Sequence, residues 1–396
     1  MRLGAERALC SGKTLAFQAN DAGSIPAARS SSTQAGASRL FHIGLVLLQT
    51  ASAAPTGDPA MSFTSRRSGF EAAKLELAEG ETSCLFVGSK GLMKHCETHQ
   101  PLPNDAAGKW PRRVLREHQP GGRIYVHATA LEHFTRGALG RINSPFVLVS
   151  GDSVPDVSRE RLGNAVIDKI LSHPHLLRWY VQNLGFEHPK AAPMPLGLDY
   201  HTISQNRRPE WGPGASARAQ EDQLHSIRLL SRPLSERRVQ GYCNWHFAIK
   251  NGDRTAVVKS LPKAACFYEP DRVQRTESWR RNSEYLFAIS PRGVGMDCHR
   301  TWEAILLGAV PVIPDLPINR LFETLPVVVV QDWATVTPGF LQTERERVLD
   351  EEFDFAPVLL ETWKRLLFGR TDLPSLRMRY QDFMKMGPGQ LCEAVL

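Results

Sequence analysis

The sequence predicts an α/β protein with two domains, each built around a parallel β-sheet. The chain has 396 residues, of which 42% are hydrophobic, so it is too long for one ordinary core but can supply two. Short apolar runs of strand length alternate along the chain with helical or irregular segments. Residues 285–314 read without interruption as strand, glycine loop, helix and strand, the βαβ unit that builds a parallel sheet.

The predicted domain boundaries follow changes in composition. Residues 1–70 are rich in Ala, Ser, Gly and Arg and show no sustained periodicity, so we expect a tail outside the folded domains. Rossmann-like α/β patterns then cover residues 71–202 and residues 237–396. Between these two domains, residues 203–236 contain a cluster of Pro, Gly and Arg that is typical of a linker or surface insertion.

The tail contains an apolar run, residues 41–55, that is similar to the core and cleavage site of a signal peptide. This run is shorter than the roughly 20 residues that span a bilayer. Three interpretations stay open: an organelle transit peptide, a signal sequence preceded by spurious residues, and a leader before a cytoplasmic start at Met61. We expect the secretory pathway, Golgi or ER, with membrane association through this segment.

In the first domain, three apolar runs are predicted to be strands: SCLFVGS around Cys84, RIYVH around Tyr125 and PFVLVSGDS from Pro145. Residues 165–185, AVIDKILSHPHLLRWYVQNLG, are expected to form a helix that is broken near Pro174. A short strand in KAAPMPLGLDYHT then leads into a loop.

In the second domain, SERRVQGYCNWHF supplies the first predicted strand and DRTAVVKSL the first helix. Residues 269–290 lead through a helix into the central strand, YLFAIS. After the glycine loop and its helix, AVPVIP and PVVVVQDW are further strands. Residues 344–370 are expected to give the last helices, and LRMRYQDFMKM to close the domain.

The glycine loop after the central strand is typical of a phosphate-binding site. Gly293 and Gly295 allow backbone N–H groups to approach a ligand closely. Asp297 is suited to cap the following helix, and Gly308 to end it. Because a helix N-terminus at the carboxyl edge of a parallel sheet favours negative charge, this unit predicts binding of a diphosphate.

Charged side chains around the loop extend this prediction. Arg292 and Arg300 would add positive charge, with Arg254 either as a helper or as a solvated surface arginine. His299 and Glu303 are four residues apart on one helix face, about 6 Å from each other, so Glu303 could accept hydrogen bonds from ribose hydroxyls. The alternative is an ordinary helix start, with Arg300 and Glu303 paired on a solvated face.

Other classes of site lack their patterns. GVGMDC has no third glycine for a dinucleotide fingerprint, and no P-loop GK[ST] occurs. The net charge of +7 favours anionic partners, but no zinc-finger spacing, RNP sequence or basic helix supports nucleic acid. The seven cysteines contain no CxxC, which argues against zinc and redox sites. Cys243 and Cys266 are the first pair to test for a disulfide, and a reduced pair is the alternative.

The pattern R-x-x-E-A-x-x-x-G-x-x-P-V, from Arg300 to Val312, resembles the donor-binding element of GT-B glycosyltransferases, particularly the exostosin-like group. In that group the helix glutamate holds the ribose of a nucleotide sugar, so the resemblance implies this role for Glu303. It covers residues 285–332 well and residues 145–202 weakly. It implies a GT-B-like fold, in which two Rossmann-like domains face a central cleft, with the donor on the second domain and the general base on the first.

Candidates for the base come from the strand ends of the first domain. Asp152 directly follows the apolar run PFVLV, where its carboxylate could deprotonate an acceptor hydroxyl. His127 ends the strand RIYVH and is the second candidate. Asp199 and His201 are expected to line the cleft near the hinge. The structural alternatives are a turn cap for Asp152, an ordinary core or loop histidine for His127, and a plain turn for GLDYH.

These observations predict an inverting glycosyltransferase that moves a sugar from a nucleoside-diphosphate sugar to a glycan or glycoconjugate acceptor. The rival hypothesis is a nucleotide-sugar-binding protein without transfer activity, and a third is another two-domain Rossmann-like transferase. No cofactor is expected. No metal is expected either, because the chain lacks the DxD triplet that holds a divalent ion on a diphosphate, so the helix dipole and arginines would replace the cation.

Overall fold

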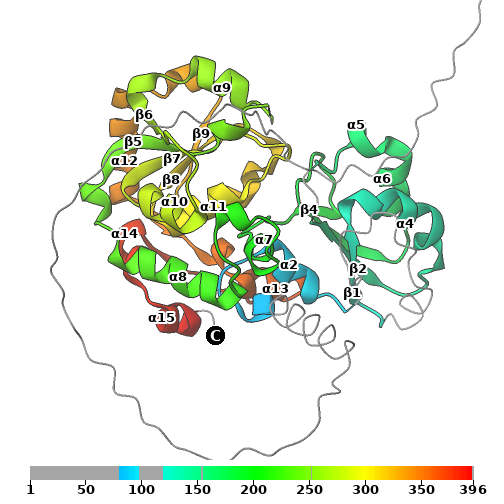
Figure 1. Cartoon of the computed structure of the whole chain (residues 1–396). Helices are drawn as coiled ribbons and strands as arrows, with labels where there is room; N and C mark the ends of the chain where they lie inside the picture. The colour runs from blue at the N-terminus through cyan, green and yellow to red at the C-terminus, as the bar shows by residue number, and fades with distance from the viewer. Residues whose placement is uncertain (1–79, 98–118, 153–154, 251, 395–396) are drawn as a thin grey trace, which may run out of the picture. The chain divides into compact units, whose positions relative to one another are not determined.

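In the computed structural model, the described residues are 80–97, 119–152, 155–250 and 252–394. They form an α/β protein with two parallel, Rossmann-like sheets (Figure 1). The predicted tail, with its apolar run, lies outside these residues. Among the described residues, no helix is both long and apolar enough to cross a membrane.

The first sheet has four parallel strands in the order β1-β2-β3-β4. Their bounds are Gly122–His127, Phe146–Gly151, Leu176–Val181 and Ala191–Pro193. Strand β2 is buried along its whole length, as its unbroken apolar sequence predicts. The helices along this part of the chain are α4 (Leu131–Gly137), α5 (Arg159–Leu162) and α6 (Asn164–Leu171).

The second sheet has five parallel strands in the order β6-β5-β7-β8-β9, so β7 is central as predicted. In sequence order, β5 to β9 are Arg238–Cys243, Cys266–Tyr268, Tyr285–Ile289, Val310–Pro314 and Val328–Val330. Its helices include α9 (Arg254–Ser260), α10 (Arg275–Asn282), α11 (His299–Leu306) and α12 (Pro338–Asp350). Helix α11 joins β7 to β8, and Gly308 follows it with φ +78°, a left-handed conformation that glycine adopts without strain.

The remaining elements lie before, between and after the sheets. They are α2 (Ser89–Lys94), α7 (Tyr200–Ser204), α8 (Ala217–Leu230), the antiparallel pair β10 (Glu352–Asp354) and β11 (Arg377–Arg379), α13 (Leu360–Leu367), α14 (Tyr380–Lys385) and α15 (Pro388–Glu393).

Two of the predicted elements are wrong. SCLFVGS is not a strand: a short 3-10 turn, Gly80–Ser83, is followed by isolated bridges from Phe86 to Leu359 and from Gly88 to Gly197. The predicted helix over residues 165–185 ends early, because LLRWYV forms strand β3. This run is rich in aromatic and apolar residues that suit a half-buried strand, and periodicity alone merged it with the preceding α6.

The segment predicted as linker or insertion also differs from expectation. Residues 203–236 contain α8, a helix of 14 residues that is capped by Ser216. Buried α8 residues include Leu224 and the charged Glu221. The segment therefore contributes to the folded core.

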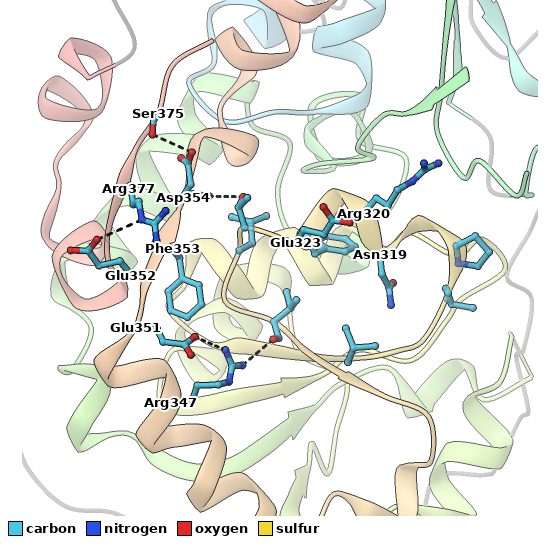
Figure 2. A pocket seen from close by; sticks show the side chains of 17 residues that line it. Asn319, Arg320, Glu323, Arg347, Glu351, Glu352, Phe353, Asp354, Ser375 and Arg377 are labelled. Atoms are coloured by element: carbon cyan, nitrogen blue, oxygen red, sulfur yellow. Dashed lines mark hydrogen bonds and ion pairs between the residues drawn. The ribbon is translucent and has the colours of Figure 1, made fainter. Parts of the chain in front are cut away.

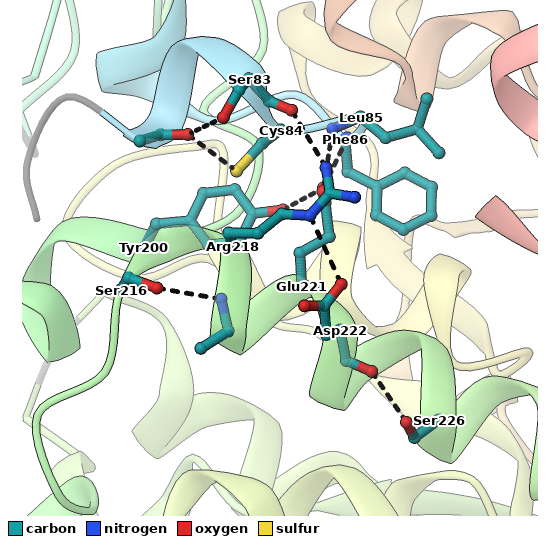
Figure 3. A network of polar contacts seen from close by, with 12 residues as sticks. Ser83, Cys84, Leu85, Phe86, Tyr200, Ser216, Arg218, Glu221, Asp222 and Ser226 are labelled. Atoms are coloured by element: carbon teal, nitrogen blue, oxygen red, sulfur yellow. Dashed lines mark hydrogen bonds and ion pairs between the residues drawn. The ribbon is translucent and has the colours of Figure 1, made fainter. Parts of the chain in front are cut away.

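Glu221 fastens the start of the described chain to α8 (Figure 3). Its Oε1 accepts hydrogen bonds from the Phe86 N–H at 2.9 Å and the Tyr200 hydroxyl at 2.8 Å. The Leu85 N–H donates to the same carboxylate at 2.9 Å. Burial raises the pKa of Glu221, and the two backbone donors oppose that effect. Three segments distant in sequence therefore depend on one buried acceptor.

We expect Glu221→Ala to lower the free energy of unfolding by about 3 kcal/mol, because two backbone N–H groups and a hydroxyl lose their buried acceptor. Urea denaturation measures the change. The matched control is Asp222→Ala, the next residue of α8, whose exposed ion pair with Arg218 should contribute less than about 1 kcal/mol. Equal losses in the two variants would contradict the central role of Glu221.

Candidate functional site

The loop between β7 and α11 is tied to the ends of the first sheet through Asp297. Its carboxylate accepts hydrogen bonds from the Leu196 N–H at 2.7 Å and the Trp302 indole N–H at 2.8 Å. Its own N–H donates to Asn183 Oδ1 at 2.8 Å. The prediction that Asp297 caps α11 is therefore wrong. Cys298 holds the cap position without a side-chain hydrogen bond, while Asp297 joins the two sheets.

Arg292, predicted to bind the diphosphate, already has a carboxylate partner. Its Nη2 donates to Asp156 Oδ2 at 2.5 Å, and the other Asp156 oxygen accepts from the Met296 N–H at 3.2 Å. The N–H groups of Met296 and Asp297 in the glycine loop are thus used by Asp156 and Asn183. The sequence predicted that backbone N–H groups of this loop bind a phosphate. These two N–H groups instead donate to protein side chains.

A second group of charges, which we call the arginine cluster, consists of Arg254, Arg300 and the neighbouring thiol of Cys298. Arg300 donates to Cys298 Sγ at 3.3 Å and to the Pro291 carbonyl. A side chain at Gly293 would come within 3.4 Å of Cys298 Sγ and 3.5 Å of Arg254 Nη2. Arg254, expected as a helper or at the surface, therefore lies half-buried beside the loop at Gly293.

The arginine cluster has an excess of positive charge. Burial first, and then the charge of Arg300, lower the pKa of Arg254 to about 10. Among the described residues, no carboxylate forms an ion pair with Arg254 or Arg300, although Asp253 lies within electrostatic reach of both. The Nε atoms of both arginines are buried without a hydrogen-bond partner among these residues. Arg254 Nη1 donates to the Trp245 and Ala248 carbonyls at 3.2 and 3.3 Å, so the hydrogen-bond partners of the cluster are neutral and an anionic ligand would supply the missing counterion.

Helix α11 carries the two remaining donor-side candidates. Glu303 is half-buried, and its carboxylate makes no hydrogen bond or ion pair with the described residues. His299 Nδ1 lies 2.7 Å from the Gly197 carbonyl oxygen, so this ring nitrogen donates to the loop after β4. Gly295 is buried in the loop. The Glu303 carboxylate is thus without a partner among the described residues, whereas His299 contributes to the contact between the sheets.

The candidates in the first domain meet around a buried lysine. This Lys90 cluster consists of Glu81, Lys90, His127, Asp152, Asp199 and His201. Lys90 Nζ lies 3.7 Å from Asp152 Oδ2, and the two side chains are only 3% and 8% exposed. Neither atom has a hydrogen-bond partner among the described residues. The two side chains therefore form a buried ion pair in which the Lys90 ammonium and the Asp152 Oδ2 atom make no hydrogen bonds with the described residues.

The backbone of Asp152 is fixed in an unusual conformation. Its φ is +55°, a left-handed value that Asp tolerates better than most residues. Its N–H donates to Gln182 Oε1 at 2.8 Å, and Gln182 in turn donates to the Pro195 carbonyl at 2.8 Å. The end of β2 thus holds the Asp152 side chain toward Lys90.

His127 and Glu81 flank this pair. His127 Nδ1 contacts the Thr129 hydroxyl at 2.7 Å, and burial lowers the pKa of His127. Burial also raises the pKa of Glu81 to about 7, while the charges of Lys94 and Lys90 oppose the increase. Glu81 Oε1 has no hydrogen-bond partner among the described residues. Burial therefore makes this carboxyl easier to protonate than an exposed glutamate.

Asp199 and His201 form a tight pair at the start of α7. His201 Nδ1 lies 3.0 Å from Asp199 Oδ1, which also caps α7 by accepting from the Thr202 N–H at 3.0 Å. Burial lowers the pKa of His201 to about 4, against the effect of the Asp199 charge. Burial would raise the pKa of Asp199, but the charges of His201 and His299 outweigh it and lower that pKa. At neutral pH the pair holds a neutral imidazole and a carboxylate.

Sequence reasoning missed Lys90, Glu81 and Asp156. Glu81 and Lys90 flank SCLFVGS, a segment that was predicted to be a strand. They reach the other members of the cluster only through tertiary contacts. Asp156 follows Asp152 by four residues, and its acidic side chain after a strand end was the available signal.

A hollow of about 690 Å³ lies elsewhere, between β9 and the β10–β11 pair (Figure 2). None of the predicted site residues lines it. Several of its polar groups have protein partners: Arg347 binds Glu351 at 2.9 Å, and Asp354 accepts from the Leu376 N–H at 2.8 Å. Because these contacts satisfy its polar lining, the hollow is a weaker candidate than the two charged clusters.

Within the described ranges, no group of three or more His, Cys, Asp or Glu residues could hold a metal ion. Cys243 and Cys266 lie on the neighbouring strands β5 and β6 as free thiols. Comparison with known proteins found no matching family model and no matching curated sequence.

The pKa of Asp297 generates a pH-dependent prediction. Burial raises this pKa from 3.8 to about 6, against its hydrogen bonds with Leu196 and Trp302. Between these two pH values the folded state binds more protons than the unfolded state, so stability falls as pH rises from about 4 to 6.

Asp297→Asn removes this titration. We expect the stability advantage of the wild type over Asp297→Asn to fall by roughly 3 kcal/mol between pH 4 and pH 7. Chemical denaturation of both proteins across this range measures the difference, and Asp350→Asn, an exposed residue at the end of α12, is the control. A pH-independent difference would show that Asp297 does not titrate as its burial indicates.

Proposed function

We propose that the chain is a glycosyltransferase of the GT-B type that moves a sugar from a nucleoside-diphosphate sugar to a glycan or glycoconjugate acceptor. The observation that carries this proposal is the arginine cluster, in which Arg254 and Arg300 lie at the carboxyl end of the central strand without a carboxylate partner among the described residues. A diphosphate would supply the missing negative charge.

Glu303 supports the same assignment. It lies one helical turn after His299 on α11, the helix that begins beside the arginine cluster, and its carboxylate has no partner within the described part of the chain. Ribose hydroxyls would donate to it while the phosphates contact the arginines. The resemblance of residues 300–312 to the exostosin-like donor element agrees with this placement.

In this proposal the Lys90 cluster is the acceptor side. It lies at the carboxyl ends of the first-sheet strands, where open α/β sheets bind ligands, and contacts through Asp297 and His299 tie that region to α11. Transfer with inversion needs one displacement at the anomeric carbon and a base that takes the proton of the acceptor hydroxyl. Asp152 and His127 are the candidates from sequence.

A second function, nucleotide-sugar binding without transfer, is favoured by the ion pair of Arg292 with Asp156. That pair removes one cation from the proposed diphosphate contacts. The two functions separate when nucleotide sugars are screened first by thermal shift and then for release of UDP or GDP with glycan acceptors present. Release supports the transferase, and a shift without release supports the binding protein. If the protein shows neither a thermal shift nor release, another class of Rossmann-like transferase is indicated.

We expect Glu303→Ala to weaken the thermal shift by UDP or GDP but to keep the full shift by inorganic pyrophosphate, since only the ribose contact is lost. Arg300→Ala should lose both, because its charge acts on the phosphates. Glu346→Ala, which removes an exposed helix carboxylate in α12, is the matched control and should leave both responses unchanged. An unchanged nucleotide affinity in Glu303→Ala would contradict the ribose assignment.

A further inference from the structure

We propose that His201, oriented by Asp199, is the general base of the transfer reaction. This inference rests on the proposed function and changes the base expected from sequence, where Asp199 and His201 were only assigned to line the cleft.

The Asp199–His201 pair has the geometry of an oriented base. His201 Nδ1 lies 3.0 Å from Asp199 Oδ1, and this proximity favours the tautomer with the ring proton on Nδ1, because the carboxylate can only accept. His201 Nε2 then carries a free lone pair. Asp199 is itself held in place by two contacts. Its side chain caps α7 by accepting from the Thr202 N–H, and its backbone carbonyl accepts from Arg275 Nη1 at 2.5 Å. The base and its positioning residue are therefore rigid.

Asp152 is less suited to take a proton. Its Oδ2 faces Lys90 Nζ at 3.7 Å, and both groups are almost completely buried. Protonation of Asp152 would leave the Lys90 ammonium buried without its counterion, which is strongly unfavourable. His127, the other sequence candidate, has a neutral hydroxyl, that of Thr129, at its Nδ1, whereas His201 has a carboxylate there that can stabilise the imidazolium.

His201 is also more accessible than the Asp152–Lys90 pair. Its side chain is 14% exposed, compared with 8% for Asp152 and 3% for Lys90. Its ring lies edge-on to that of His299, with centroids 6.4 Å apart. His299 opens α11, the helix that also carries Arg300 and Glu303. A base at His201 therefore lies beside the helix to which the donor is assigned.

The step balances with these residues alone. The acceptor hydroxyl gives its proton to His201 Nε2 as its oxygen forms a bond to the anomeric carbon. The bond between that carbon and the phosphate oxygen breaks, and the nucleoside diphosphate leaves with the electron pair. Asp199 stabilises the imidazolium that forms, and proton loss to solvent regenerates the neutral ring.

The test uses the full chain and a donor that releases UDP or GDP in the wild type. We expect His201→Ala to lower transfer by about 10² to 10⁴-fold while the thermal shift by the nucleotide is retained. Added imidazole should restore part of the activity in His201→Ala but not in Asp152→Asn. His133→Ala, an exposed histidine on α4, is the control and should transfer at the wild-type rate.

The pH profile gives a readout that a structural role would not change. His201 must be neutral to act, and Asp199, Lys90, Asp152 and His299 are the charged or titratable groups that act on it. The wild-type rate should stay level down to about pH 5 and fall below it as the ring is protonated. In Asp199→Asn the rate should drop and this acid limb should move to lower pH, because the carboxylate no longer favours the imidazolium.

Two results would overturn the inference while the proposed function stands: transfer by His201→Ala within threefold of wild type, or equal imidazole rescue of His201→Ala and Asp152→Asn. The failure of the proposed function looks different. In that case neither the wild type nor His133→Ala releases nucleoside diphosphate from any donor, and the assignment of the base falls with it.

Discussion

The buried carboxylate of Asp297 is the constraint on which both charged clusters depend. It must accept from the Leu196 N–H and the Trp302 indole at once, so the β7–α11 loop cannot move away from the end of the first sheet without leaving buried donors unpaired. Arg292 precedes it and His299 follows it, and each contacts a residue at the end of the first sheet, Asp156 and Gly197 respectively. The contacts of the β7–α11 loop with the end of the first sheet thus connect the two clusters.

Much of the fold could be predicted from the sequence because its signals are local. Buried parallel strands such as β2 and β7 are unbroken apolar runs, and the glycine loop with α11 and β8 forms one continuous βαβ unit. Strand β3 was missed because its burial alternates irregularly and it follows α6 after only four residues, 172–175. Strand β6 was missed because its three residues give no periodicity.

The candidate site could be predicted only in part. Parallel topology brings strand ends to one edge, so His127, Asp152 and Asp199 could be expected near one another from their positions after predicted strands. Their partners did not, because an ion pair such as Lys90 with Asp152 joins segments that are distant in sequence. Asp297 illustrates the same limit: a local pattern indicates a helix cap, but its hydrogen bonds are set by tertiary packing. Local sequence predicts the element on which a residue lies, whereas tertiary packing determines which groups its side chain contacts.

The crowding of Arg254 and Arg300 has a consequence for selectivity. Two like charges held together by the surrounding backbone repel each other, and any anion that fits between them would relieve that repulsion whatever chemical group it belongs to. In the proposed donor site, the attraction of these charges would therefore be generic for phosphorylated ligands. Discrimination among them has to come from contacts beyond the phosphates, and a half-buried carboxylate such as that of Glu303, one turn along the helix, would reject ligands that offer it no hydroxyl.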